Sequence, residues 1–278
     1  MSDIGALIVA SPLIPVVGIV AASIAIVPYR TAVLGPRMLF AMFAVVIGAM
    51  IASFKGFSPV TVNAGFLGAC ILISIWPLYY LMRARAARAI EGAVEIAPPF
   101  SGRWRCAAGG PLKELNHHVG SAPEQYAYDF YFPNAVGWPA LPWARTNEAY
   151  LAYGKDILAP AEGTVARVVD GQPEGSPPRS APEGEKKPAG NHVVIEIEGG
   201  FLVLAHFKPG SVVVKSGQHL RRGDRIAACG NSGRSTMPHL HVHLQQKPGA
   251  GKGKGVPLVF RDARGRRVAP VTGEFLFA

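Results

Sequence analysis

Three long runs without a charged residue dominate the first 82 positions and limit what this chain can fold into. They cover residues 4–27, 38–54 and 64–82. A helix needs roughly 20 apolar residues to cross about 30 Å of hydrocarbon, with about 17 as the lower limit. We therefore predict three transmembrane helices here, rather than a buried soluble bundle, with a short linker that ends at residue 97.

The sequence changes character at Pro98-Pro99, where glycine and proline begin to separate short β-branched runs. This texture is typical of an all-β domain, which we place at residues 98–278. We expect strands at 163–169, 192–197, 201–206 and 239–245. Residues 171–190 are rich in Pro, Gly, Glu and Lys and almost free of apolar side chains. We predict a flexible insertion there, without a chemical role.

Net charge and cysteine content restrict the possible partners. A charge of +10 suits an anionic partner such as phospholipid or a wall polymer. No zinc-finger spacing, aromatic RNA-binding signature or recognition helix indicates nucleic acid. The three cysteines, Cys70, Cys106 and Cys229, form no CxxC pair, which excludes zinc held by thiolates. We expect Cys106 and Cys229 to be buried and unpaired, with a disulfide between them as the alternative.

His239-Leu240-His241 places two histidines on one face of a predicted strand. In a plain core each ring nitrogen needs a hydrogen-bond partner, whereas beside a zinc ion one imidazole can ligate and the other can handle a proton. An isolated HxH also fits a half-exposed strand, so further ligands decide the interpretation. His117-His118 and Asp129, in the aromatic run 126–131, are candidates, because a buried aspartate needs a metal or a partner.

Gly230-Asn231-Ser232-Gly233 and the following residues 235–241 resemble the signature of the lysostaphin-type zinc endopeptidases, which cut peptide cross-links in bacterial cell walls. The resemblance covers roughly residues 116–245. Further matching blocks lie at residues 155–165, 190–197, 205–207 and 209–225. It implies a β domain built on an antiparallel sheet, a partly open barrel related to lipoyl-type domains.

Carried over by position, the resemblance implies that His118, Asp129 and His241 bind one zinc ion. His206 and His239 would remain unligated and act in catalysis. His117 is the alternative to His118, since the family spacing is usually His-x-x-x-Asp and the separation here is eleven residues. An inserted loop at residues 120–125 would account for the difference.

The remaining polar residues of these blocks receive lesser roles. Asn231 and Ser232 are expected to line the substrate groove. Asp156 is a competing carboxylate in a block where the family has no ligand. His243 stands where the family usually has another residue type, and we interpret it, with His192 and His219, as structural.

These roles predict metal-assisted amide hydrolysis. Zinc would make water nucleophilic at neutral pH, and His239 would take its proton and pass it to the leaving amine. His206 would stabilise the oxyanion or orient the water. Two other hypotheses are a non-hydrolytic regulator of a separate wall hydrolase and a lipoyl-like binding module, which residues 212–225 also resemble.

The location follows from the predicted spans and the predicted substrate. Met1-Ser2-Asp3 lacks the basic stretch of a cleaved signal peptide, so the first helix would remain as an anchor. Five arginines flank the side that carries the β domain, against Lys55 on the other, and the positive-inside rule points to the cytoplasm. A wall substrate requires the opposite side. We predict a multi-pass protein of the bacterial inner membrane, in contact with the lipid bilayer, with its β domain outside the cytoplasm.

Overall fold

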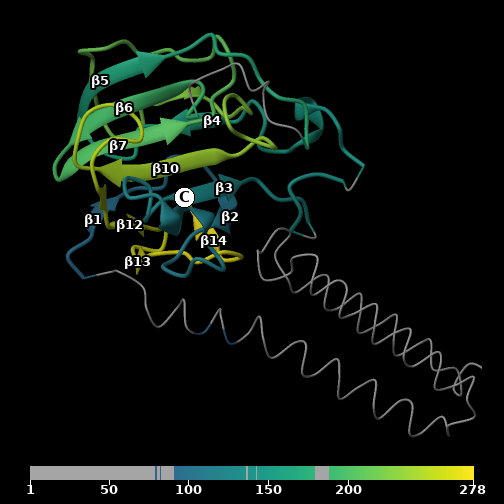
Figure 1. Ribbon diagram of the computed structural model, residues 1–278, viewed down its shortest axis with the longest axis horizontal. Coiled ribbons are helices and arrows are strands. Elements are labelled where there is room, and N and C mark those ends of the chain that lie inside the picture. Colours follow the sequence, from purple (N-terminus) through teal and green to yellow (C-terminus); the bar gives the residue numbers. More distant parts are fainter. Residues whose placement is uncertain (1–78, 80–81, 83–90, 136, 142, 179–187) are drawn as a thin grey trace, which may run out of the picture. The chain divides into compact units, whose positions relative to one another are not determined.

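The computed structural model describes Tyr79, Met82 and residues 91–135, 137–141, 143–178 and 188–278 (Figure 1). The three predicted spans lie outside these residues, apart from Tyr79 and Met82. None of the helical chain that is described has the length and apolar content needed to cross a membrane. This finding corrects two predictions: it does not support an N-terminal region of three transmembrane helices, nor a multi-pass location in the membrane.

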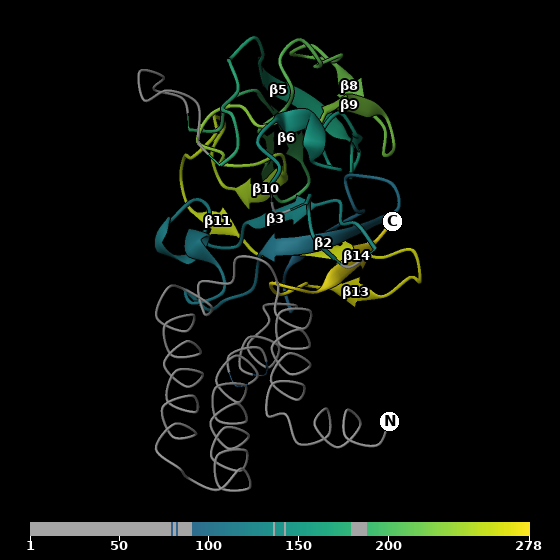
Figure 2. The same ribbon diagram turned by 90° about the vertical axis from the view of Figure 1, so that its right-hand side faces the viewer.

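A large antiparallel sheet forms the centre of the compact unit Ala84–Ala278. Its strands run in the order β14-β2-β3-β10-β7-β6-β5-β8, and β11 pairs with β10 (Figures 1 and 2). They are β2 (Arg103–Ala108), β3 (Tyr128–Tyr131), β5 (Gly163–Val169), β6 (His192–Ile197), β7 (Gly200–Ala205), β8 (His219–Leu220), β10 (Leu240–Gln245), β11 (Gly255–Val256) and β14 (Phe275–Phe277). The four strands predicted from the sequence are confirmed as β5, β6, β7 and β10.

Two smaller sheets and two short 3-10 turns complete the described part of this unit. One sheet contains β1 (Val94–Ile96), β12 (Leu258–Arg261) and β13 (Arg267–Val268), with β1 and β12 parallel. The other pairs β4 (Asp156–Leu158) with β9 (Arg225–Ala228). The turns are η2 (His117–Gly120) and η3 (Asn147–Ala149). Because β1 pairs with β12, ordered β structure begins within the predicted linker.

Side-chain alternation along β10 and β3 separates the core from the polar face. Leu240, Val242 and Leu244 of β10 are buried in the main apolar core. Because successive strand residues point to opposite faces, His241 and the odd-numbered positions that follow it lie on the other face. Asp129 of β3 pairs directly with His241 across the two strands. The register of two neighbouring strands thus brings an acid and an imidazole together.

Candidate metal centre and catalytic histidines

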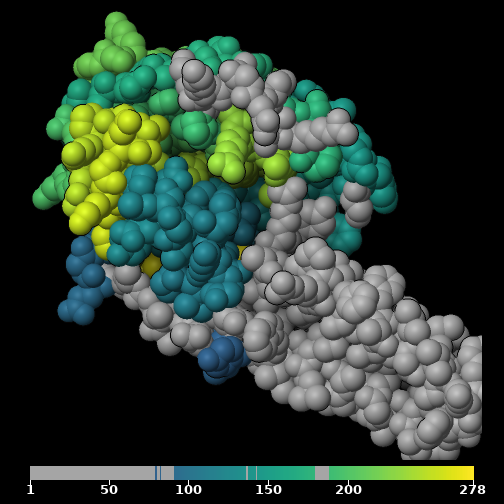
Figure 3. All heavy atoms as spheres, in the orientation of Figure 1, coloured from purple at the N-terminus to yellow at the C-terminus, as the bar shows by residue number. Residues whose placement is uncertain are grey.

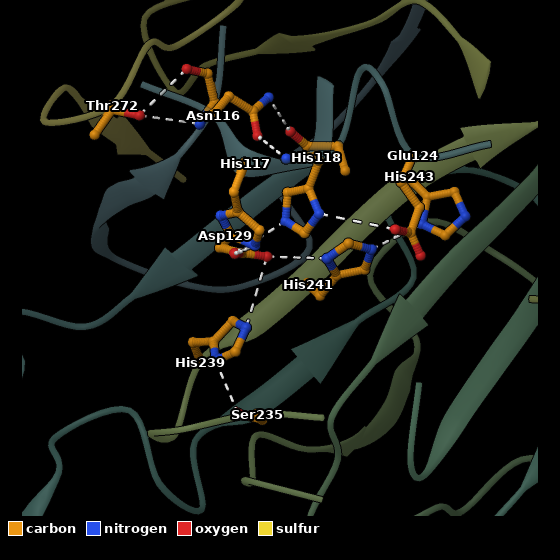
Figure 4. Close-up of polar contacts among 12 residues, drawn as sticks. Asn116, His117, His118, Glu124, Asp129, Ser235, His239, His241, His243 and Thr272 are labelled. Atoms are coloured by element: carbon orange, nitrogen blue, oxygen red, sulfur yellow. Dashed lines mark hydrogen bonds and ion pairs between the residues drawn. The ribbon is translucent and has the colours of Figure 1, made fainter. Parts of the chain in front are cut away.

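The carboxylate of Asp129 is the centre of a cluster of imidazoles (Figure 4). Its Oδ1 lies 2.9 Å from Nδ1 of His241, and its Oδ2 lies 3.1 Å from Nε2 of His118. All three residues are buried. The structure therefore brings together the three side chains that the sequence proposes as ligands, from β3, β10 and η2.

Asn116 positions His118. The Asn116 side chain caps η2 by accepting a hydrogen bond from the backbone N–H of His118, at 3.2 Å. Its amide group donates to the carbonyl of Gly110 and to that of Ala127, two residues before Asp129. Asn116 thus ties the turn to the start of β3, which keeps His118 near Asp129 despite the long spacing between them.

The loop at residues 120–125 packs against the C-terminal part of the chain, as the adjacent teal and yellow surfaces in Figure 3 illustrate. The backbone N–H of Gly255 donates to the carbonyl of Ala122 at 2.7 Å. From this loop Glu124 approaches Nδ1 of His118 to 3.9 Å, an ion-pair distance rather than a hydrogen bond. The loop supplies a carboxylate behind the candidate ligand, which the sequence analysis did not identify.

His117 is the weaker candidate for the first ligand. Its Nε2 is 3.8 Å from Oδ2 of Asp129, and its side chain is 69% exposed. The side chain of His118 is 10% exposed and contacts the same oxygen at 3.1 Å. Distance and burial both favour His118.

The charges in this cluster are strongly coupled. Burial lowers the pKa of His118, but the adjacent Asp129 carboxylate outweighs burial and raises it to about 10. Burial likewise raises the pKa of Asp129, while His118 and His239 outweigh it and hold that pKa well below its usual range. Each of the two side chains, Asp129 and His118, therefore favours the charged form of the other.

The donor set fits a zinc ion. Zinc is commonly held by two imidazole nitrogens and a carboxylate oxygen, with one position left for water or substrate. Metal-ligand atoms lie within 4.8 Å of one another in two groups among the described residues, His117–His118–Asp129 and Glu124–His241–His243. The proposed triad draws on both groups, and the contacts of Asp129 with His118 and His241 connect them.

His239 and His206 stand beside this centre, with ring centroids 4.8 Å apart. Nδ1 of His239 lies 2.8 Å from the carbonyl of Met237, and Nδ1 of His206 lies 2.8 Å from the carbonyl of Ser232. A carbonyl only accepts hydrogen bonds, so each Nδ1 carries the proton. The second ring nitrogen, Nε2, is left free of this contact in both residues, and that of His239 lies 3.6 Å from Oδ1 of Asp129.

His206 has a left-handed backbone, with φ of 66°, directly after β7. This conformation is uncommon for residues other than glycine and costs of order 1 kcal/mol or more. Its backbone N–H donates to the carbonyl of Ala189, and its ring donates to Ser232. These contacts hold the strained residue with its ring beside His239.

Asn231 and Ser232 do not line a groove with their side chains, which corrects their predicted substrate contact. Both residues are fully buried. The Asn231 amide donates to Asn147 and to the carbonyl of Gly175, while the Ser232 hydroxyl donates to the carbonyl of Phe207. Their side-chain hydrogen-bonding groups are used inside the fold, and the backbone carbonyl of Ser232 contacts the ring of His206.

Part of the predicted flexible insertion is anchored next to these residues. Oε1 of Glu174 accepts a hydrogen bond from the backbone N–H of Asn231 at 2.8 Å, and Oε2 accepts one from the Tyr153 hydroxyl at 2.8 Å. A β-bridge also joins Glu174 to Ser232. Glu174 is therefore tied to the fold, while residues 179–187 of the same predicted insertion lie outside the described residues. A single glutamate among Pro and Gly residues carries no pattern from which this contact could be inferred.

The other candidates lie elsewhere. Asp156 is exposed and pairs with Arg225 at 2.6 Å, and His219 is exposed and pairs with Glu162 at 3.0 Å. His192 is buried in β6, with Nδ1 2.8 Å from the carbonyl of Gly190. Cys106 and Cys229 are buried and free, as expected.

An all-β domain that surrounds a buried aspartate with four histidines has the types of side chain that hold zinc in metallopeptidases. Residues 148–256 match peptidase family M23, so the chain carries a peptidase domain of this family, in agreement with the lysostaphin-type resemblance. The matched segment contains His206, His239 and His241. His118 and Asp129 lie before it, and it is the structure that brings them to the same centre.

Curated relatives share short segments with the chain. The peptidoglycan DD-endopeptidase ShyA of Vibrio cholerae is 45% identical over 56 residues, which are 20% of this chain and 13% of that protein. An uncharacterized metalloprotease of Haemophilus influenzae is 34% identical over 94 residues, 34% of this chain and 17% of that protein. The chain thus spans less than a fifth of the length of these relatives.

Among solved structures, the catalytic domain of lysostaphin from Staphylococcus simulans is 16% identical, with a TM-score of 0.33 over 56% of this chain and 89% of that chain. The catalytic domain of an M23 protein, EnpA, from Enterococcus faecalis is 19% identical, with a TM-score of 0.36 over 58% of this chain and 93% of that chain. At these TM-scores the likeness carries no weight.

Proposed function

We propose that this domain is a zinc-dependent endopeptidase that hydrolyses peptide cross-links in peptidoglycan. The observation that carries the proposal is the buried carboxylate of Asp129 between His118 and His241, with His239 and His206 beside it. Membership of peptidase family M23 supports the reaction class. The substrate class is supported by relatives named peptidoglycan DD-endopeptidases.

In this proposal His118, Asp129 and His241 hold the metal. The chemistry that a bound zinc ion supplies is Lewis acidity, which makes water nucleophilic at neutral pH and polarises a carbonyl. Burial of the three side chains excludes bulk water from around the cluster and strengthens its electrostatic interactions.

His239 acts as the general base and then the general acid. Nδ1–H is donated to Met237, so in the neutral ring Nε2 is the nitrogen that can take the proton of the attacking water. The Asp129 carboxylate, 3.6 Å from Nε2, stabilises the imidazolium that results. The same nitrogen then delivers the proton to the departing amine.

His206 orients the water. Burial holds the pKa of His206 well below its usual value, so the ring stays neutral with Nε2 as an acceptor. A neutral ring in this tautomer accepts a hydrogen bond from water but has no Nε2 proton to offer an oxyanion. Of the two roles that the sequence left open for His206, orienting the water fits this arrangement.

The test uses the purified full chain, zinc analysis and cross-linked peptidoglycan fragments separated by chromatography. The parent should bind one zinc per chain and convert cross-linked dimers to monomers. His241→Ala should lose both zinc and turnover, whereas His239→Ala should keep zinc and lose turnover, with exposed His219→Ala as the matched control.

Two outcomes would contradict the proposal. Equal zinc content in the His241→Ala and parent proteins would remove His241 from the metal site. A fully loaded parent that leaves the fragments intact but activates a separate wall hydrolase would identify a regulator instead.

A further inference from the structure

We propose that His243 and Gln245 form a hydrogen-bond relay that fixes the tautomer of His241, so that Nδ1 of His241 is presented to the metal without a proton. This inference rests on the proposed zinc site. His243 and Gln245 are thereby positioning residues: they act through His241 and touch neither metal nor substrate.

The three residues share one buried face of β10. Strand alternation places positions 241, 243 and 245 on the same side, and all three are nearly inaccessible to solvent. Nε2 of His241 is 2.8 Å from Nδ1 of His243, and Nε2 of His243 is 2.9 Å from Oε1 of Gln245. The side chains form a continuous chain of hydrogen bonds that ends at the candidate metal centre, and Figure 4 labels its two histidines, His241 and His243.

The backbone fixes the orientation of the Gln245 amide. Its Nε2 donates to the carbonyls of Lys247 and Gly249, at 2.6 and 2.5 Å. Its Oε1 accepts from the backbone N–H groups of Gly251 and Lys252, at 3.0 and 3.2 Å. In the opposite orientation the amide NH2 would face the N–H groups of Gly251 and Lys252, and the amide oxygen would face the carbonyls of Lys247 and Gly249. Only one orientation therefore satisfies all four contacts.

The proton positions follow from this anchor. Because Oε1 of Gln245 is an acceptor, Nε2 of His243 must carry the proton that joins them. A neutral imidazole has one N–H, so Nδ1 of His243 is an acceptor and takes its hydrogen bond from Nε2–H of His241. His241 is left with a lone pair on Nδ1, facing Oδ1 of Asp129 at 2.9 Å.

Two acceptors at this distance repel each other unless a proton or a metal cation lies between them. A metal bound to Nδ1 of His241 and to the Asp129 carboxylate would remove this repulsion, as the proposed zinc site requires. Metal-binding histidines usually donate their second N–H to a carboxylate, a carbonyl or water, and loss of that partner typically costs about 10- to 100-fold in metal affinity. Here the partner is a second imidazole, held in turn by a glutamine.

The test compares His243→Leu, which removes the acceptor, with His243→Asn, whose Oδ1 can replace Nδ1 as an acceptor. His192→Gln is the matched control, because His192 is a buried histidine on the same sheet, separated from His241 by Ala205 of β7. Zinc affinity is measured in the full chain by chelator competition. We expect about a 10- to 100-fold loss for His243→Leu, substantial recovery for His243→Asn, and parental affinity for His192→Gln.

Ring protonation provides the second readout, by ¹⁵N NMR of the histidines in zinc-free and zinc-loaded protein. We expect His243 to be protonated on Nε2 and unprotonated on Nδ1 in both states. A proton on Nδ1 of His243 would overturn the relay, and so would parental zinc affinity in His243→Leu. Two zinc ions per parent chain would also overturn it, because Glu124, His241 and His243 could then hold a metal themselves. If the parent binds no zinc, the proposed function fails, while the His243 tautomer still tests the relay by itself.

Discussion

Replacing Glu174 with alanine should destabilise the β domain and weaken the support of His206. The substitution leaves the buried backbone N–H of Asn231 and the hydroxyl of Tyr153 without the acceptors that they contact at 2.8 Å. A hydrogen bond to a charged group contributes about 1.5–3 kcal/mol. Glu174 is only half-buried, so water can replace part of the loss, and we expect about 3 kcal/mol in total.

Calorimetry of the full chain measures this effect. For a unit of this size 1 kcal/mol shifts the melting temperature by about 2–4 °C, so Glu174→Ala should lower Tm by about 6–12 °C. Glu174→Gln keeps one oxygen for Asn231 and should lose less. Exposed Glu162→Ala is the control, because an isolated surface ion pair contributes little. A Tm for Glu174→Ala equal to that of the control would refute the anchoring role of the insertion.

Two further predictions concern protons. The pKa of His118 is raised to about 10, so zinc must displace a proton from this ring when it binds. Zinc affinity, measured by chelator competition, should therefore rise about tenfold per pH unit between roughly pH 6.5 and 8. An affinity that levels off above about pH 7, as for an ordinary histidine, would contradict this. The pKa of Asp262 is raised by burial but lowered further by hydrogen bonds from Arg266 and Arg264, with a net decrease. Because the folded-state pKa is depressed, the stabilisation is complete above the unfolded pKa and is lost as pH falls through the folded pKa. Asp262→Asn should therefore unfold more easily than the parent in urea at neutral pH, and the difference should shrink at pH values below about 3.9; a difference independent of pH would contradict the reasoning.

The contrast between His239 and Asn231 illustrates where prediction from the sequence ended. The spacing of His239 and His241 places both on one strand face, and that local rule holds because side-chain direction alternates along any strand. Asn231 and Ser232 were assigned to substrate because they belong to the same motif. Their burial depends on Phe207, Asn147 and Gly175, which pack around them from distant parts of the chain.

The apolar N-terminal runs show a different limit. Their length and lack of charge alone led to the predicted transmembrane helices, and no described helix supports such a span.

The sequence by itself determined four strands of the β domain, β5, β6, β7 and β10, the shared face of His241 and His243, and the residue types of a candidate zinc site. The tertiary structure alone decided that His118 rather than His117 lies buried against Asp129, that Glu174 anchors the Asn231 loop, and that Gln245 orients its amide toward His243. Strand periodicity is local and can be read along the chain. Proximity of residues such as Asp129 and His241, 112 positions apart, depends on which strands pair and in what register.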